Sequence, residues 1–209
     1  MNIPYEKAKG LIKEADVLLF RAAKFPGVGW WIGSYTRSDY SHAGIAHWEN
    51  GELYVVEFRE FKGSRKHLLD EYIKEGKQID VFRPVETVIY PLIQQDTFDD
   101  TYYLTYTEQR FTADIAQAII STALELLGKD YSYWTIWQMF KTYIPFVRLG
   151  RKVIKNGEPT PKSFVCSTLV TYAYRKHYID PVPFLSDGYT SPGDLARSGL
   201  FSRIFSIKS

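Results

Sequence analysis

The sequence predicts an α+β domain in which helices pack against a mostly antiparallel sheet. Two strand-like runs, at 41–48 and 53–59, flank the Asn50-Gly51 pair, and this arrangement is the strongest short-range signal of a hairpin. Helical periodicity then dominates the second half of the chain, at 109–127 and 164–178. Helices combined with a sheet of this kind indicate the α+β class.

Further elements follow from short patterns along the chain. A helix at 109–127 carries apolar residues at helical spacing and ends at Gly128. The other predicted elements are a helix at 4–14 broken by Gly10, a strand at 16–21, a loop at 25–31, a helix at 64–74, a strand at 78–83 ended by Pro84, a helix at 131–143, a short helix at 191–199 opened by Ser191-Pro192, and a strand at 200–207.

Length and composition fit one domain over residues 1–209. Of the 209 residues, 45% are hydrophobic and 24% charged, which excludes disordered, collagen-like and coiled-coil proteins. A Thr-, Tyr- and Asp-rich segment at 86–108 is predicted to be an insertion, either a hairpin or a lid. Prolines and glycines at 144–162 predict an irregular connection.

Charge and cysteine content exclude several classes of function. A formal net charge of +2 gives no electrostatic case for binding nucleic acid. A single cysteine excludes an intramolecular disulfide and leaves Cys-cluster metal sites without ligands. No apolar run approaches the ~18 residues of a membrane span. The N-terminus lacks the apolar stretch of a signal peptide, so we expect a cytoplasmic protein as synthesised. The oligomeric state is not predicted.

The single thiol, Cys166, is a candidate nucleophile. Ser163 is a plausible N-cap, which would place Cys166 in the first turn of a helix. There the positive end of the helix dipole favours the thiolate, and the free N–H groups can stabilise an oxyanion. The alternative is a small buried core residue, which is the commonest role of a free cysteine.

A thiol nucleophile needs a base, and His42 is the favoured candidate. It opens a strand and is followed by the small residues Ala43 and Gly44, which leave room for an approaching chain. His47 lies five residues further on, so strand alternation points it to the other face and disfavours a shared metal site. His67 and His177 lie among basic residues and are expected to be solvent-exposed.

Hairpin register supplies a partner for the base. If Asn50-Gly51 is a two-residue turn, paired positions sum to 101, so Gly44 faces Glu57. His42 and Glu57 are then diagonal neighbours on one face, within reach of a long side chain. A carboxylate there would fix the imidazole tautomer and stabilise the imidazolium. The alternative for Glu57 is a solvated strand residue, which its apolar neighbours disfavour.

These residues lie in stretches that resemble a known family. The chain is similar to the circularly permuted branch of the NlpC-type papain-like cysteine hydrolases, in particular the YiiX/YaeF-like amidases, and more distantly to lecithin–retinol acyltransferases. His precedes Cys here, as in the permuted branch. The matching stretches, in order, are 36–45 around His42, 54–57 ending in Glu57, 126–133 with its Gly-x-x-Tyr, 164–170 around Cys166, and 191–195 with the sequence Ser-Pro-Gly-Asp-Leu.

The resemblance implies a papain-like fold whose antiparallel sheet packs against helices that include the nucleophile helix. It makes Cys166 the nucleophile, His42 the general base and Glu57 the third polar residue of a triad. Tyr131 and Ser167 are assigned to the oxyanion or substrate-lining part of the site, with one more core ring as the alternative for Tyr131. The implied reaction passes through a thioester and needs no metal or organic cofactor.

The substrate is expected to be an amide of a cell-wall peptide. The alternatives are a lipid acyl hydrolase or acyltransferase of the same fold, and a catalytically silent binding or structural module such as a virion component. Trp30, Trp31, Trp134 and Trp137 would line an acyl-chain groove in the lipid case, or belong to the core. Relatives in this family often carry export signals. A phage-encoded or lysis-released enzyme would need no such signal, and it is the alternative to a cytoplasmic one.

Overall fold

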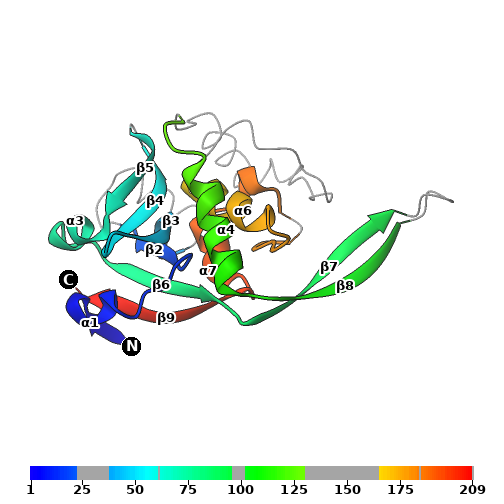
Figure 1. Cartoon of the computed structure of the whole chain (residues 1–209), viewed down its shortest axis with the longest axis horizontal. Coiled ribbons are helices and arrows are strands. Elements are labelled where there is room, and N and C mark those ends of the chain that lie inside the picture. The colour runs from blue at the N-terminus through cyan, green and yellow to red at the C-terminus, as the bar shows by residue number, and fades with distance from the viewer. Residues whose placement is uncertain (23–37, 61, 96–101, 130–164, 184, 209) are drawn as a thin grey trace.

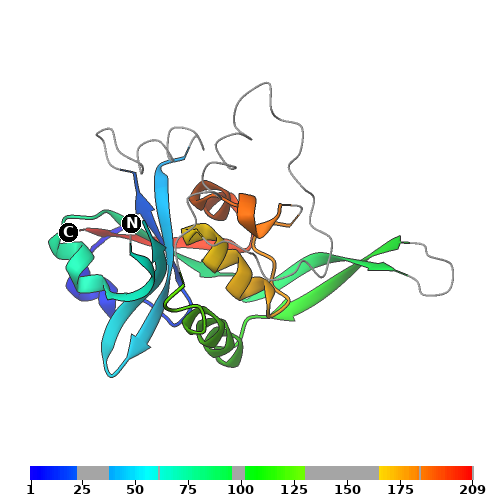
Figure 2. The same cartoon turned by 90° about the horizontal axis from the view of Figure 1, so that it is seen from above.

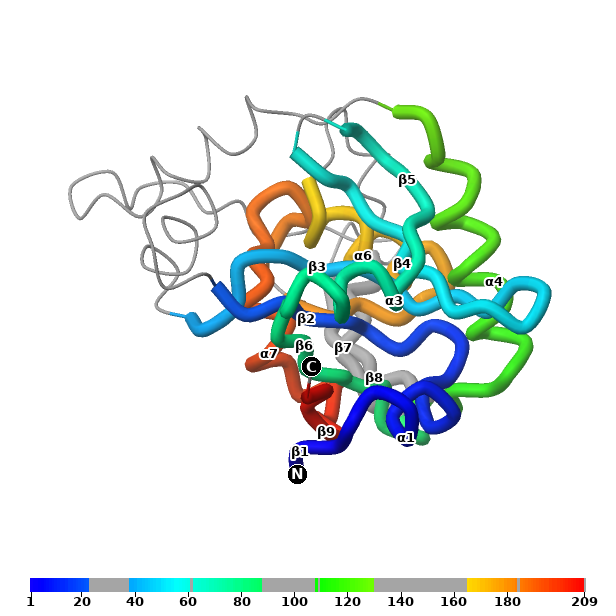
Figure 3. Tube along the Cα trace, turned by 90° about the vertical axis from the view of Figure 1, so that its left-hand side faces the viewer, coloured from blue at the N-terminus to red at the C-terminus, as the bar shows by residue number. Residues whose placement is uncertain are grey.

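The computed structural model describes residues 1–22, 38–60, 62–95, 102–129, 165–183 and 185–208. Its main sheet has seven strands, which are β1 (Asn2–Pro4), β2 (Val17–Arg21), β3 (Tyr40–Glu49), β4 (Glu52–Arg59), β5 (Gly63–Leu68), β6 (Ile79–Pro84) and β9 (Phe201–Lys208) (Figure 1). Their order across the sheet is β1-β9-β6-β2-β3-β4-β5, as Figure 3 shows. β1 and β9 are parallel, and the other neighbouring pairs are antiparallel, which agrees with the predicted sheet.

Helices cover both faces of this sheet, so the molecule has two hydrophobic cores. The described helices are α1 (Tyr5–Lys9), α3 (Leu69–Lys74), α4 (Ala113–Leu124), α6 (Cys166–Arg175), α7 (Pro192–Arg197) and the 3-10 turn η1 (Asp187–Tyr189). One core lies between the sheet and α4, α6 and α7 (Figure 2). The second core lies between the other face and α1 and α3. None of the helices in the described residues is long and apolar enough to cross a membrane.

The β3–β4 hairpin has the predicted turn and register. Asn50 and Gly51 have φ angles of 52° and 78°, as a tight two-residue turn between twisted strands requires. Pairing runs from Glu49 opposite Glu52 to Ile45 opposite Val56, so every pair sums to 101. This register brings the start of β3 beside the end of β4.

Helix α6 begins later than predicted. Its N-cap is Val165, and Cys166 is its first residue, whereas Ser163 was predicted as the cap. Ser163 itself lies outside the described residues. Every residue of α6 from Cys166 to Tyr174 is buried, so the helix runs through the interior. Its hydroxyl groups bind the following chain, because Ser167 Oγ donates to the carbonyl oxygen of Thr190 over 2.5 Å.

Helix α7 begins as predicted. The Ser191 side chain accepts a hydrogen bond from the Asp194 N–H, and the Asp194 carboxylate accepts one from the Ser191 N–H. Pro192 occupies the first turn, where a missing N–H costs nothing.

Three predicted helices differ from the structure. The helix expected at 4–14 is the shorter α1, which ends at Lys9, and the preceding residues form β1. The helix expected at 64–74 is a strand, β5, followed by the short helix α3. Gly63–Leu68 has few apolar residues, and it is a strand because it pairs with β4 at the edge of the sheet, where charged residues are favoured. Leu127 was expected on the apolar face of a helix reaching 127, but α4 ends at Leu124 and Leu127 is exposed.

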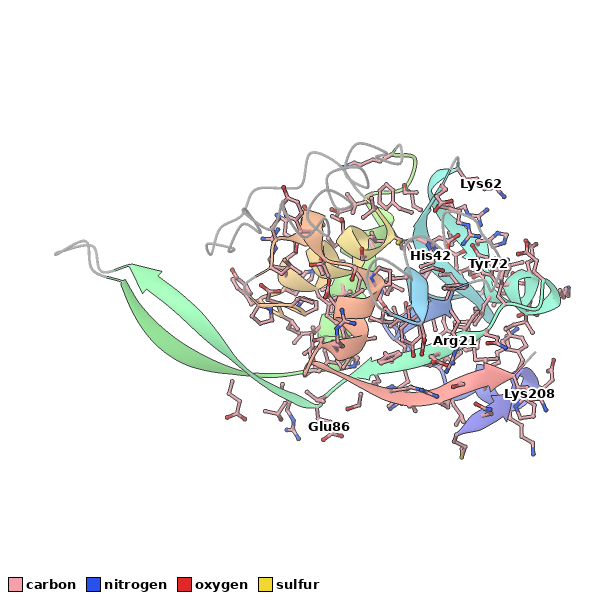
Figure 4. The ribbon with its side chains drawn as sticks, turned by 180° about the vertical axis from the view of Figure 1, so that it is seen from behind. Arg21, His42, Lys62, Tyr72, Glu86 and Lys208 are labelled. Carbon is pink, nitrogen blue, oxygen red and sulfur yellow. The ribbon has the colours of Figure 1, made fainter. Side chains whose placement is uncertain are left out.

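Within the 86–108 segment, the structure has the hairpin form of the two that were considered. β7 (Thr87–Gln95) pairs with β8 (Tyr102–Arg110) in a separate two-stranded sheet. The hairpin projects from the body of the molecule (Figures 1 and 2) and points away from His42 (Figure 4). The predicted loop at 25–31, helix at 131–143 and connection at 144–162 lie outside the described residues.

Candidate active site

His42 and Glu57 meet where β3 begins and β4 ends. The Nε2 atom of His42 lies 2.6 Å from Oε2 of Glu57, so the contact expected from the hairpin register is present. Glu57 is completely buried and His42 is 9% exposed. Gly44 makes this approach possible, because a Cβ there would lie 2.4 Å from Cγ1 of Val55 and 3.4 Å from Cβ of Glu57.

The thiol of Cys166 reaches the same imidazole from α6. The Cys166 side chain interacts with the ring of His42 and raises the pKa of that imidazole. Because Nε2 is bound to Glu57, Nδ1 is the ring nitrogen that remains for the sulfur. Cys166 is 4% exposed and occupies the first position of α6, where the backbone N–H groups have no partner within the helix. The ring of His42 therefore lies between a carboxylate and a thiol.

Electrostatics favour a charged ring at this position. Burial alone favours neutral imidazole, but the Glu57 carboxylate and the Cys166 side chain outweigh burial and raise the pKa of His42 to about 9. Burial likewise opposes the charged form of Glu57, but His42, Tyr72 and Arg65 lower its pKa to about 2. At neutral pH the site therefore holds a carboxylate and an imidazolium, with the Nε2–H donating to Glu57.

The second oxygen of Glu57 is also occupied. Arg65 Nε donates to Oε1 over 2.8 Å, and the Tyr72 hydroxyl donates to the same atom. Arg65 stands directly opposite Glu57 in the β4–β5 pairing. Its Nη2 also donates to the Tyr72 hydroxyl oxygen over 2.8 Å, which closes a ring of three hydrogen bonds.

Aromatic packing seals this network from water. Phe20 pairs with His42 across β2 and β3, and their rings meet edge to face with centroids 5.1 Å apart. The same ring contacts Tyr72 edge to face at 4.8 Å. In Figure 4, His42 and Tyr72 lie next to each other. A low local dielectric strengthens every charge interaction in this cluster.

The remaining sequence candidates have different positions. The Ser167 hydroxyl is used inside the fold, where it donates to the carbonyl oxygen of Thr190. Tyr131 and the four tryptophans of the predicted groove lie outside the described residues.

The other three histidines each have a partner elsewhere. Nδ1 of His47 lies 2.6 Å from Oε1 of Glu14. The expectation that His67 and His177 are exposed is wrong, since both are half-buried. His67 pairs with Glu71 at 3.1 Å, and Nε2 of His177 lies 2.9 Å from Oγ1 of Thr122.

Sequence reasoning missed Arg65 and Tyr72. The basic run at 64–67 has no apolar alternation, so it gave no strand signal, and without β5 the cross-strand partner of Glu57 was hidden. A salt-bridge search along β4 could have found Arg65, because a buried carboxylate needs a cation as well as a base.

Comparisons with known proteins identify the family of the chain. The model of a family described as "Permuted papain-like amidase enzyme, YaeF/YiiX, C92 family" matches residues 18–144, which is more than half of the chain. The chain belongs to this family. It is accordingly a hydrolase of the papain-like amidase kind, as the sequence resemblance implied.

A solved structure supports the fold independently. The chain resembles a crystal structure of yiiX from Escherichia coli O157:H7, with a TM-score of 0.50 and 16% identity, over 92% of this chain and 96% of that one. At this identity the likeness concerns the fold alone. Among curated proteins, no match to the chain was found.

The E. coli protein is described as a metalloprotein. Within the described ranges of this chain, no group of three or more His, Cys, Asp or Glu side chains is arranged to hold a metal ion.

Proposed function

We propose that this amidase cleaves an amide bond of a cell-wall peptide through a thioester on Cys166, with His42 and Glu57 as the other members of a catalytic triad. The observation that carries the proposal is the position of the His42 ring, which is bonded to Glu57 through Nε2 at 2.6 Å and interacts with the Cys166 side chain. Base, orienting group and nucleophile are the three parts that nucleophilic catalysis by a thiol needs.

In the proposed reaction the Cys166 sulfur, as thiolate, attacks the carbonyl carbon and forms a C–S bond. The imidazolium of His42 gives its proton to the leaving nitrogen as the C–N bond breaks, and an amine departs. Neutral His42 then takes a proton from water, whose oxygen attacks the thioester. The C–S bond breaks, the carboxylic acid leaves, and the thiolate–imidazolium pair is restored.

Backbone groups at the start of α6 would hold the developing negative charge. The N–H groups of the first helical residues point out of the helix end, and the helix dipole favours an anion there. Ser167 contributes through its N–H, since its hydroxyl binds Thr190. In a buried site such donors are worth far more than they are in water.

Membership of an amidase family favours a peptide substrate. Peptidoglycan stem peptides are the substrate class we test first. Phospholipid vesicles represent the alternative class of acyl donor.

The test is mass spectrometry of acid-quenched protein after incubation with purified stem peptides and, separately, with phospholipid vesicles. We expect an acyl adduct on Cys166 with stem peptides and cleaved peptide in the supernatant. Cys166→Ala is expected to lower turnover by about 10³-fold or more while keeping the fold, as judged by circular dichroism. An adduct formed with vesicles alone would indicate a lipid substrate instead of a peptide. Full turnover by Cys166→Ala would refute the proposal.

A further inference from the structure

We propose that Arg65 and Tyr72 are positioning residues that share one oxygen of Glu57 and so limit how strongly this carboxylate stabilises the imidazolium of His42. This proposal rests on the proposed function, because it concerns the histidine of that triad. It adds two residues on β5 and α3 to a site otherwise built from β3, β4 and α6.

The two oxygens of the Glu57 carboxylate have different hydrogen-bond partners. Oε1 accepts from Arg65 Nε at 2.8 Å and from the Tyr72 hydroxyl, while Oε2 faces His42 Nε2 at 2.6 Å. The Tyr72 hydroxyl has one proton, which it gives to Glu57, so it must accept the bond from Arg65. With Oε1 saturated, Oε2 is the oxygen available to the imidazole.

This division has a chemical consequence for His42. A buried carboxylate that has lost water and faces an imidazole alone is a strong base, and it would hold the imidazolium firmly. Two donors on Oε1 withdraw negative charge from that carboxylate, and the Arg65 cation also repels the imidazolium. His42 then releases its proton to a leaving amine more easily than it would beside an unshared Glu57.

Other charged and titratable groups lie around this network and also influence the protonation of His42. On the side of α6, Cys166 favours the imidazolium. Around Tyr72, the guanidinium of Arg59 lies 5.5 Å from the ring centre and the ring of His67 lies 4.8 Å away. Glu71 pairs with His67. Among the described residues, Arg65 is the arginine that touches Glu57 itself, so its removal has the clearest sign.

If Arg65 and Tyr72 had a purely structural role, their removal would have a different effect on the pKa of His42. An ion pair that merely joins β4 to β5 would cost stability when removed, yet leave His42 unchanged or, if Glu57 turned away, less basic. The proposed role predicts a more basic His42. The direction of the change therefore separates the two roles.

The experiment is an NMR titration of the histidine rings between pH 5 and 11 in the full chain, with the His42 signal assigned from His42→Gln. In Arg65→Met we expect the pKa of His42 to rise by about one unit, because a cation is removed from its carboxylate. In Tyr72→Phe, which keeps the ring against Phe20, we expect a rise of about half a unit. Arg65→Lys keeps the positive charge, so we expect the pKa of His42 in this variant to stay close to the wild-type value.

Arg83→Met is the matched control. Arg83 also binds a buried carboxylate, that of Asp16, with Nε at 2.8 Å from Oδ1 and Nη2 at 2.7 Å from Oδ2. We expect that variant to lose stability and to leave the His42 titration unchanged. An unchanged or lowered pKa of His42 in Tyr72→Phe overturns the proposal, even if Arg65→Met fails to fold. A Cys166 that forms no adduct in the wild type would instead refute the proposed function, and the titration would still be readable.

Discussion

Glu57 on β4 and Asp80 on β6 are both completely buried in the same sheet, and each is bound by a tyrosine hydroxyl and an arginine. At Asp80 the donors are Tyr40, at 2.5 Å, and Arg21 Nη2, at 2.9 Å, both to Oδ2. At Glu57 the donors are Tyr72 and Arg65, both to Oε1. The two clusters therefore share their chemistry of charge compensation.

They differ in what the second oxygen does. Oε2 of Glu57 binds the ring of His42, which also interacts with Cys166. The second oxygen of Asp80, Oδ1, has no hydrogen-bond partner in the part of the chain that the structure describes. The further cation, Arg203, also lies at Oδ2, with Nε at 3.6 Å, and no histidine is among the partners found in the described residues. A carboxylate held by Tyr and Arg is thus a structural element of this sheet, and an adjacent imidazole and thiol convert one copy of it into a candidate catalytic group.

Removing the charge of each carboxylate gives the largest expected contrast. Glu57→Gln leaves burial as the main influence on His42, so we expect the pKa of His42 to fall from about 9 to below 6.5 and turnover to drop by about 10²-fold or more. Asp80→Asn is expected to cost about 3–5 kcal/mol of unfolding free energy while His42 titrates as before. NMR titration, peptide turnover and urea unfolding measure these effects. If Glu57→Gln and Asp80→Asn both fold and lose equal activity, the distinction between a catalytic and a structural carboxylate would be wrong.

The pH dependence of stability sharpens the same comparison. The pKa of His42 is raised to about 9 from 6.5, so its contribution is complete below pH 6.5 and is lost as the pH rises toward 9. We expect the stability advantage of the wild type over His42→Gln to shrink by about 2–3 kcal/mol across this window. The pKa of Tyr40 is raised by burial and Asp80, so the Asp80 cluster does not titrate there. The difference between wild type and Asp80→Asn should stay constant in urea titrations from pH 6 to 9, and a parallel decline of both differences would contradict this account.

The smallest expected effect comes from crowding Glu57 without touching its donors. In Gly44→Ala the new methyl would meet Val55 at 2.4 Å and the carbonyl oxygen of Val56 at 3.2 Å. Val55 is completely buried and β-branched, so it can give way only at a cost, and we expect a loss of about 1–2 kcal/mol in unfolding free energy. Gly10→Ala has open space and an ordinary φ of −69°, and serves as the control. Equal melting temperatures for both variants would show that β3 and β4 are not tightly packed at Glu57.

The sequence predicts the His42–Glu57 contact because a tight Asn-Gly turn leaves one register for the hairpin. It also places Cys166 at a helix start, although the cap is Val165 rather than Ser163. It does not predict Arg65, whose strand forms through pairing with β4 rather than through its own apolar pattern. The meeting of Cys166 with His42 depends on how α6 packs against the sheet, a long-range arrangement that local patterns do not encode.

The account stands on a thiol paired with a charged ring, and the alkylation rate of Cys166 with iodoacetamide between pH 4 and 10 tests this most directly. The chain has one cysteine, so mass spectrometry reads a single site. We predict rapid alkylation that persists well below pH 8, where an ordinary thiol is mostly protonated, and its loss at low pH in His42→Gln. A wild-type rate that appears only above pH 8 and matches that of His42→Gln would contradict the account.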